Sequence, residues 1–167
     1  MSTEWIENTF PTDDPETSQE ALERCILGDF GPESVHATLD DLVEHAQQAP
    51  VFRELLLQVC NELLAQAWYA TDANRFRERR ILIGLFLIIR RIPLKAVAHQ
   101  LRHWFDRHSP LLESDELDHG LGFAALCAIY LIEGERSEPD RLWWERHRGS
   151  EIWRPKIAEV ERFTIRS

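Results

Sequence analysis

The stretch Ile81–Ile89, which reads ILIGLFLII, decides how the fold of this chain is interpreted. It holds nine apolar residues, counting its glycine, and two arginines stand directly before it and two directly after it. A helix needs about 20 apolar residues to cross a bilayer, so the stretch is too short to span a membrane. A buried strand fits the length, but the helical pattern extends over 74–91 and no other stretch offers a strand partner. We therefore expect a helix over 74–91 that other helices cover on every side.

Apolar residues recur at helical spacing along most of the remaining chain. The expected helices are 15–27, 32–48, 50–70, 93–107, 115–133, 139–148 and 150–163, and the dipeptide Ser109-Pro110 is expected to end the fifth helix of the chain, 93–107. Prolines stand at the start of five helices, where the missing N–H costs no hydrogen bond. The sequence thus predicts an all-α protein, a single globular bundle of seven or eight helices. The apolar helices 74–91 and 115–133 are expected at its centre.

Two features bear on how this bundle is organised. The first three helix-opening prolines follow one another at 17 and 18 residues, which leaves a short α-solenoid of helical hairpins as the alternative. The length favours one domain, so we expect an extended N-terminal arm over 1–13 and a single helical domain over 14–167. Gly120 and Gly122 make helix 115–133 thin, and we expect this face to approach helix 74–91 closely near Gly84.

Charge is distributed unevenly along the sequence. The net charge is −10. Residues 1–74 hold 15 acidic and 2 basic side chains, residues 75–107 hold 2 and 9, and residues 108–167 hold 12 and 8. Such blocks either neutralise each other inside the fold or give the protein a bipolar surface that attracts charged partners.

The acidic N-terminal half predicts a non-enzymatic protein–protein interaction module with a basic partner. An adaptor, a small subunit of a complex and an immunity-type inhibitor all fit this description. The candidate partner-binding residues are acidic side chains of the helix 32–48 and tryptophans of the C-terminal third, a residue type enriched at binding hot spots: Asp40, Asp41, Glu44, Trp143, Trp144 and Trp153. The competing interpretation is that two of the three tryptophans close the bundle.

The basic region 75–107 gives the alternative function, a subunit that contacts nucleic acid. Phosphate binding requires a cluster of basic side chains, and the candidates are Arg75, Arg79, Arg80 and Arg102. The acidity of the whole chain argues against a DNA-binding domain.

A helical metal-dependent enzyme is a minor alternative. His99 and His103 lie four residues apart with Asp106 nearby, and Glu116 and His119 have the spacing found in di-iron bundles. Neither set is complete, and no phosphate-binding loop or nucleophile motif is present, so we expect no catalytic residue, metal or cofactor. Three scattered cysteines and the lack of an apolar leader favour a cytoplasmic protein.

Overall fold

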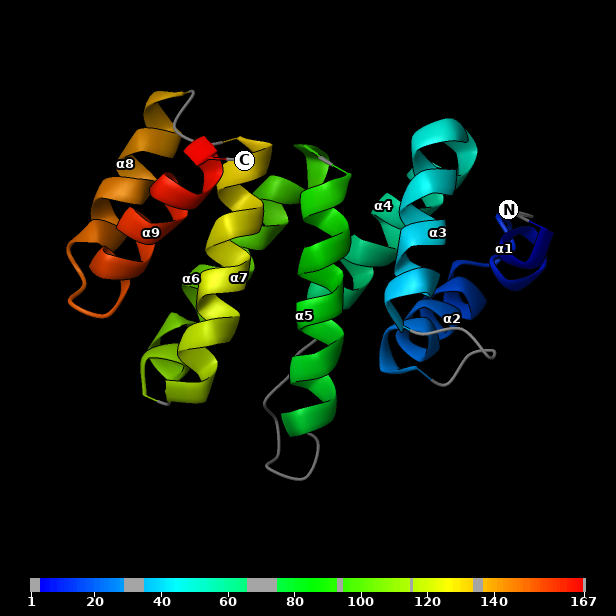
Figure 1. Ribbon diagram of the computed structural model, residues 1–167, viewed down its shortest axis with the longest axis horizontal. Coiled ribbons are helices and arrows are strands. Elements are labelled where there is room, and N and C mark those ends of the chain that lie inside the picture. Colours follow the sequence, from blue (N-terminus) through cyan, green and yellow to red (C-terminus); the bar gives the residue numbers. More distant parts are fainter. Residues whose placement is uncertain are drawn as a thin grey trace. The chain divides into compact units, whose positions relative to one another are not determined.

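The computed structural model describes residues 4–28, 35–65, 75–92, 95–114, 116–133 and 137–166. Within these ranges the chain forms nine helices and no strand, which confirms the all-α prediction (Figure 1). The helices are α1 Glu4–Thr9, α2 Pro15–Leu27, α3 Val35–Gln48, α4 Pro50–Ala65, α5 Arg75–Arg91, α6 Lys95–Glu113, α7 Glu116–Ile132, α8 Glu138–Arg148 and α9 Trp153–Arg166.

Local sequence signals explain where several helices begin and end. Asp14 caps α2, because its carboxylate accepts a hydrogen bond from the Thr17 backbone N–H at 3.2 Å, and Pro15 follows as the first helical residue. Gly28 ends the same helix in the left-handed conformation at φ 81°, which glycine adopts without steric cost. Ser137 caps α8 in the same way as Asp14 caps α2. These bounds agree with the predicted ones to within one residue.

The N-terminal residues differ from the extended arm expected over 1–13. Glu4–Thr9 form the short helix α1, and both Ile6 and Phe10 are buried. The Phe10 ring meets the Phe52 ring of α4 edge-on, with the centroids 5.7 Å apart. Docking of these two side chains stabilises a segment that has too few residues to be helical by itself.

Helix α6 continues through the dipeptide that was expected to end it. Pro110 lies inside the helix and is exposed, so the predicted break at Ser109-Pro110 is wrong. Proline removes the N–H that would bond to the carbonyl of residue 106. The Ser109 hydroxyl donates to that Asp106 carbonyl at 3.5 Å and partly replaces the lost hydrogen bond. Beyond the proline, Leu112 is fully buried and supports the last turn.

The chain divides into two compact units, Met1–Ile92 (unit 1) and Pro93–Ser167 (unit 2). In unit 1, helix α2 packs against α3, α4 and α5, and α3 also packs against α4 and α5. Most of the stretch Ile81–Ile89 is buried, as expected for a core helix. One side of it is only partly covered, because Ile83 is 37% exposed and Leu87, one turn later, is half-buried. The expectation that this helix is covered on every side is therefore wrong for that face.

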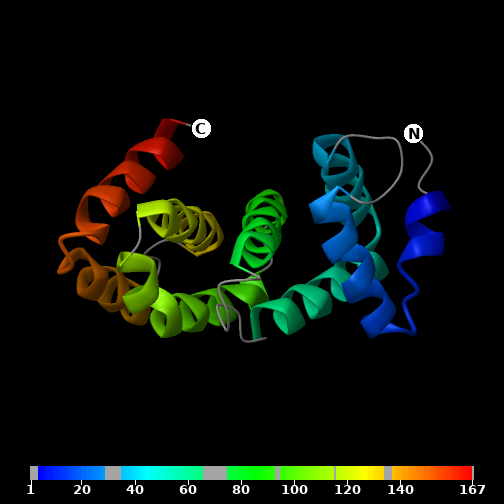
Figure 2. The same cartoon turned by 90° about the horizontal axis from the view of Figure 1, so that it is seen from below.

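In unit 2, helix α7 lies between α6 and α9, and α8 packs against α9 (Figure 2). Gly122 of α7 allows close packing with α9, since a Cβ atom there would lie 2.3 Å from the Trp153 ring. Gly84 of α5 has a similar role in unit 1 against Ile26 of α2. Gly84 and Gly122 each accommodate a side chain of their own unit, and the expected approach of helix 115–133 to helix 74–91 stays a prediction. A Cβ atom at Gly120 would meet nothing within 4 Å, so this glycine makes no close approach.

None of the helices in the described ranges combines the length and apolar character needed to cross a membrane.

Candidate functional site

A surface groove between α3 and α5 is the candidate functional site of unit 1. Both helices run in the same direction along it (Figure 1). The groove has a volume of about 170 Å³, and its lining residues are Leu39, Asp40 and Val43 of α3 with Leu87, Ile88 and Arg91 of α5. These residues come from helical positions three and four apart, which places them on the facing sides of the two helices.

The groove has an apolar floor and a charged edge. Leu39, Val43 and Ile88 are buried and form the floor, and half-buried Leu87 forms a wall. At the edge, Arg91 forms an ion pair with Asp40, and both side chains are about half exposed, at 48% and 58%. An ion pair as exposed as this one contributes little to stability, so its partners are available for exchange.

Carboxylates distinguish the surface of helix α3. Val35–Gln48 contains three carboxylates and neither lysine nor arginine. Asp40 and Glu44 are exposed and lie one turn apart. Asp41 is only 6% exposed, so it does not belong to the acidic surface as the sequence had suggested. Of the three acidic candidates, Asp40 lines the groove and Glu44 follows it one turn later on the exposed side of α3.

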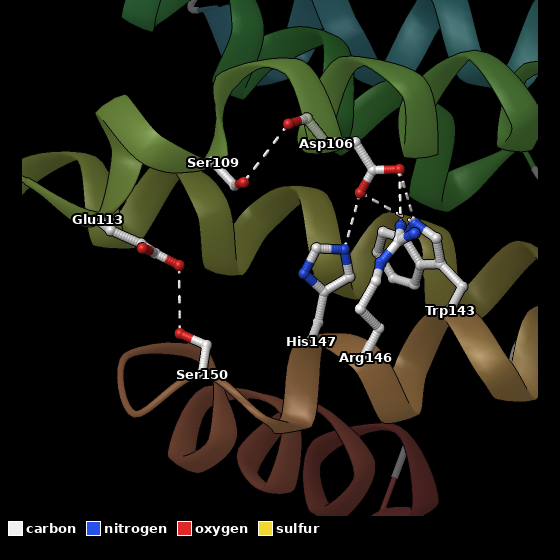
Figure 3. Close-up of polar contacts among 7 residues, drawn as sticks. All are labelled: Asp106, Ser109, Glu113, Trp143, Arg146, His147 and Ser150. Atoms are coloured by element: carbon white, nitrogen blue, oxygen red, sulfur yellow. Dashed lines mark hydrogen bonds and ion pairs between the residues drawn. The ribbon is translucent and has the colours of Figure 1, made fainter.

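A second polar cluster, centred on Asp106, connects α6 with α8 in unit 2 (Figure 3). The Asp106 carboxylate accepts hydrogen bonds from Trp143 Nε1 at 3.2 Å and from the Arg146 guanidinium at 3.0 Å. His147 Nε2 lies 2.8 Å from the same carboxylate. Partial burial alone would raise the pKa of Asp106, but the contacts with His147, Trp143 and Arg146 outweigh it and lower the pKa below its usual value.

Aromatic rings and a second set of charges surround this cluster. The His147 ring lies 4.4 Å from Trp143 and 4.9 Å from Phe105, measured between ring centroids. One turn before Asp106, Arg102 forms ion pairs with Asp140 at 2.6 Å and with Glu133 at 3.2 Å. The Arg102 guanidinium also lies 5.7 Å from the centroid of the Trp143 ring. These contacts fasten α8 to α6.

The Asp106–His147 contact resembles an acid–base pair, but the neighbouring hydroxyls have other partners. Ser109 donates to the Asp106 backbone oxygen, and Ser150 donates to the Glu113 carboxylate at 3.2 Å (Figure 3). The carboxylate of Asp106 is itself occupied by three donors. The geometry therefore fits a structural link between two helices.

The tryptophan candidates are buried inside unit 2. Trp144 and Trp153 are fully buried and Trp143 is 8% exposed. Trp144 meets Tyr130 and Trp143 edge-on, and Trp153 meets the ring of Phe105 at 5.1 Å. Packing accounts for all three tryptophans, one more than the competing interpretation expected, and their role in binding a partner stays a prediction.

The basic candidates belong to both units, and those whose side chains are described contact protein groups or are half-buried. Arg80 donates to the backbone oxygen of Leu27 at 2.9 Å, and Arg79 is half-buried. Arg102 belongs to unit 2, where its side chain is 15% exposed and engaged by two carboxylates. Arg75 begins α5, and its side chain lies outside the described part of the structure.

The metal-like spacings do not assemble into a site in the described residues. No group of three or more histidine, cysteine or carboxylate side chains placed to hold a metal ion occurs among them. His99 and His103 are exposed on α6, and His119 contacts the Glu113 backbone oxygen at 3.0 Å. The side chain of Glu116 lies outside the described part.

The cysteines are free thiols in apolar surroundings. Cys25, Cys60 and Cys127 are all buried. Burial raises the pKa of Cys25 to about 11 and that of Cys60 to about 12. At neutral pH only a very small fraction of each of these two thiols is ionised to the thiolate, so neither is suited to nucleophilic chemistry.

Sequence reasoning missed both the groove and the Asp106 cluster. For the cluster, Arg102 and Asp106 lie at i and i+4 on α6, while Asp140, Trp143 and His147 follow at i, i+3 and i+7 on α8. This spacing marks two complementary polar faces, but it does not say that they face each other. For the groove, the pairing of α3 with α5 has no local signal at all.

Comparison with known proteins adds no relative: no family model, no curated protein and no solved structure matches this chain.

Proposed function

We propose that this protein is a non-enzymatic protein–protein interaction module that binds its partner along the α3–α5 groove. The observation that carries the proposal is an apolar groove with the exposed ion pair of Asp40 and Arg91 at its edge, on a helix, α3, that contains three carboxylates and neither lysine nor arginine. Apolar surface rimmed by charge is typical of protein interaction sites. The acidic composition of residues 1–74 agrees with a basic partner.

The groove has the size and the surroundings of a docking site. A volume of about 170 Å³ accepts one large side chain of a partner. Exposed Ile83 extends the apolar surface along α5, one helical turn before Leu87. Anchor side chains that fill pockets of this kind provide much of the binding free energy at protein interfaces.

The alternative of a nucleic-acid-contacting subunit has less support. Arg80 and Arg102, two of its candidate residues, donate to protein groups in the structure. The acidic surface of α3 would also repel phosphates.

Affinity purification with the full-length chain as bait tests the proposal. At low salt we expect one captured protein whose amount falls as salt rises, because charge attraction is screened. Leu87→Lys, which puts a charge on the groove wall, and Asp40→Lys, which reverses the charge at the edge, are expected to abolish capture. Glu54→Lys is the matched control, since Glu54 is exposed on α4 and does not line the groove.

Mapping of the complex decides whether capture reflects the groove. Hydrogen exchange of the bait is expected to slow in α3 and α5 when the partner is bound. The proposal fails if the bait is alone at low salt. It also fails if Leu87→Lys and Glu54→Lys capture the partner equally well.

A further inference from the structure

We infer that the occupant of the α3–α5 groove is an amphipathic helix of a partner protein, with one large apolar anchor flanked by lysine or arginine. This inference rests on the proposed function and specifies the partner of the same site. Three observations carry it: the volume of the groove, the spacing of Leu87 and Ile83 on α5, and the two exposed carboxylates of α3, Asp40 at the groove edge and Glu44 one turn later.

The volume sets the size of the anchor. An apolar cavity of about 150 Å³ is known to hold a benzene molecule, and the groove provides about 170 Å³. It therefore fits the side chain of a leucine, methionine or phenylalanine. The floor of Leu39, Val43 and Ile88 offers that side chain only apolar contacts.

The spacing of apolar residues on α5 selects a helical partner. Leu87 at the groove and exposed Ile83 lie four residues apart on the same side of α5, about 6 Å along the helix axis. A helix that lies along α5 presents its own apolar side chains with the same repeat. An anchor in the groove and a second apolar residue over Ile83 then follow from the usual i, i+4 pattern of helix-in-groove recognition.

The charge of α3 selects basic flanks. Asp40 and Glu44 are exposed one turn apart, and no lysine or arginine of α3 neutralises them. The ion pair of Asp40 with Arg91 is exposed on both sides, so exchange of Arg91 for a partner's basic residue costs little. Lysine or arginine residues one turn apart on the bound helix match this pair of carboxylates.

Synthetic peptides test the inference on the isotopically labelled full-length chain. The probe is an alanine-rich helical peptide of about 16 residues, long enough to be partly helical in water. It carries two leucines four residues apart and lysines on the flanking positions. At low salt we expect its addition to shift backbone NMR signals of α3 and α5.

Two further peptides and two pairs of protein variants define the result. Replacing the leucine that is designed to enter the groove with alanine is expected to weaken binding about tenfold, since most of the buried apolar side chain is lost. Replacing the lysines with glutamates is expected to abolish it. Asp40→Asn with Glu44→Gln is expected to weaken binding severalfold, while Glu54→Gln with Glu62→Gln on α4 leaves it unchanged. All four substitutions replace exposed side chains, and circular dichroism verifies that the fold is retained.

Several outcomes overturn the inference. One is the absence of signal shifts at millimolar peptide, and another is a set of shifts outside α3 and α5. Equal binding of the leucine and alanine peptides excludes an anchor. A dimer in analytical ultracentrifugation that Leu87→Lys dissociates would make a second copy of this chain the occupant. If affinity purification yields a groove-dependent partner but the peptides do not bind, the inference fails and the proposed function stands.

Discussion

Asp106 illustrates how a single partly exposed carboxylate joins two helices. Three side chains of α8 direct donors at it, from Trp143, Arg146 and His147. Hydrogen bonds to a charged group contribute about 1.5–3 kcal/mol when they are protected from water. The Asp106 side chain is 39% exposed, which reduces this contribution.

We predict that Asp106→Ala lowers the free energy of unfolding by about 1–2 kcal/mol. The substitution leaves the donors of α8 without their acceptor. Urea unfolding monitored by tryptophan fluorescence measures the change. Glu145→Ala is the control, because the Glu145–Arg141 ion pair on α8 is exposed on both sides and contributes at most about 0.5 kcal/mol. Equal effects of the two substitutions would show that the Asp106 cluster does not fasten α8.

A second prediction concerns His108, one turn before the end of α6. This residue is only 7% exposed, and burial with the nearby charge of Arg107 lowers its pKa to about 4. The unfolded chain, with a histidine pKa near 6.5, then binds more protons than the folded chain between these two values. On account of His108, the free energy of unfolding is therefore highest above about pH 6.5, where this histidine is neutral in both states, and it declines as the pH falls toward 4.

Urea unfolding at pH 7.5 and pH 5 tests this expectation. The free energy of unfolding is expected to fall by about 2 kcal/mol between the two values on account of His108. His108→Gln removes this share of the pH dependence, and His103→Gln, at an exposed position of the same helix, leaves it in place. The usual carboxyl pKa of Asp106 lies below this window, so its titration does not interfere. If His108→Gln leaves the difference in the free energy of unfolding between pH 7.5 and pH 5 unchanged, His108 is not the source of this pH dependence.

At the scale of the elements, the two glycines of α7 differ in the space around them. Gly122 admits the ring of Trp153, and a Cβ atom there would lie 2.3 Å from it. That ring cannot move aside easily, because Phe105 packs against it. Gly120 has open space around its Cβ position. A small side chain at these two positions therefore has opposite consequences.

We predict that Gly122→Ala destabilises the protein by about 1–3 kcal/mol through overpacking. Gly120→Ala is expected to stabilise it by about 0.5–1 kcal/mol, since alanine restricts the unfolded chain and favours a helix. Thermal unfolding of the two variants provides the comparison. Destabilisation by both substitutions would mean that helix packing at Gly120 is also tight.

The same glycines show how far an element can be predicted from its sequence. The small residues in 115–133 do not reveal that the ring of Trp153 fills the space at Gly122, because a missing side chain carries no information about the side chain that takes its place. Pro110 shows the opposite limit. A proline usually ends a helix, yet burial of Leu112 and the hydroxyl of Ser109 allow α6 to continue. A contact distant in sequence decides the first case, whereas a local hydrogen bond and the burial of Leu112 act together in the second.

For the whole molecule, the apolar stretch Ile81–Ile89 correctly predicted an all-α core, since nine apolar residues in a helical pattern require burial. It did not predict that Ile83 remains exposed, because coverage depends on which helices pack nearby. The candidate site, too, was predicted only in part from the sequence. Asp40 and Glu44 were identified by charge, but the apolar groove beside them exists only when α3 and α5 come together.

The division into Met1–Ile92 and Pro93–Ser167 leads to the last prediction. Each unit has its own buried apolar core, so the two are expected to unfold in separate transitions on heating. Gly84→Ala, whose Cβ would lie 2.5 Å from Ile26, is expected to lower the transition of unit 1. Gly122→Ala lowers that of unit 2, in each case by about 5 °C or more. Differential scanning calorimetry distinguishes this result from one common transition that both variants shift. A common transition would mean that the chain unfolds as the single domain that its length suggests, because packing between the units would then be as cooperative as packing within them.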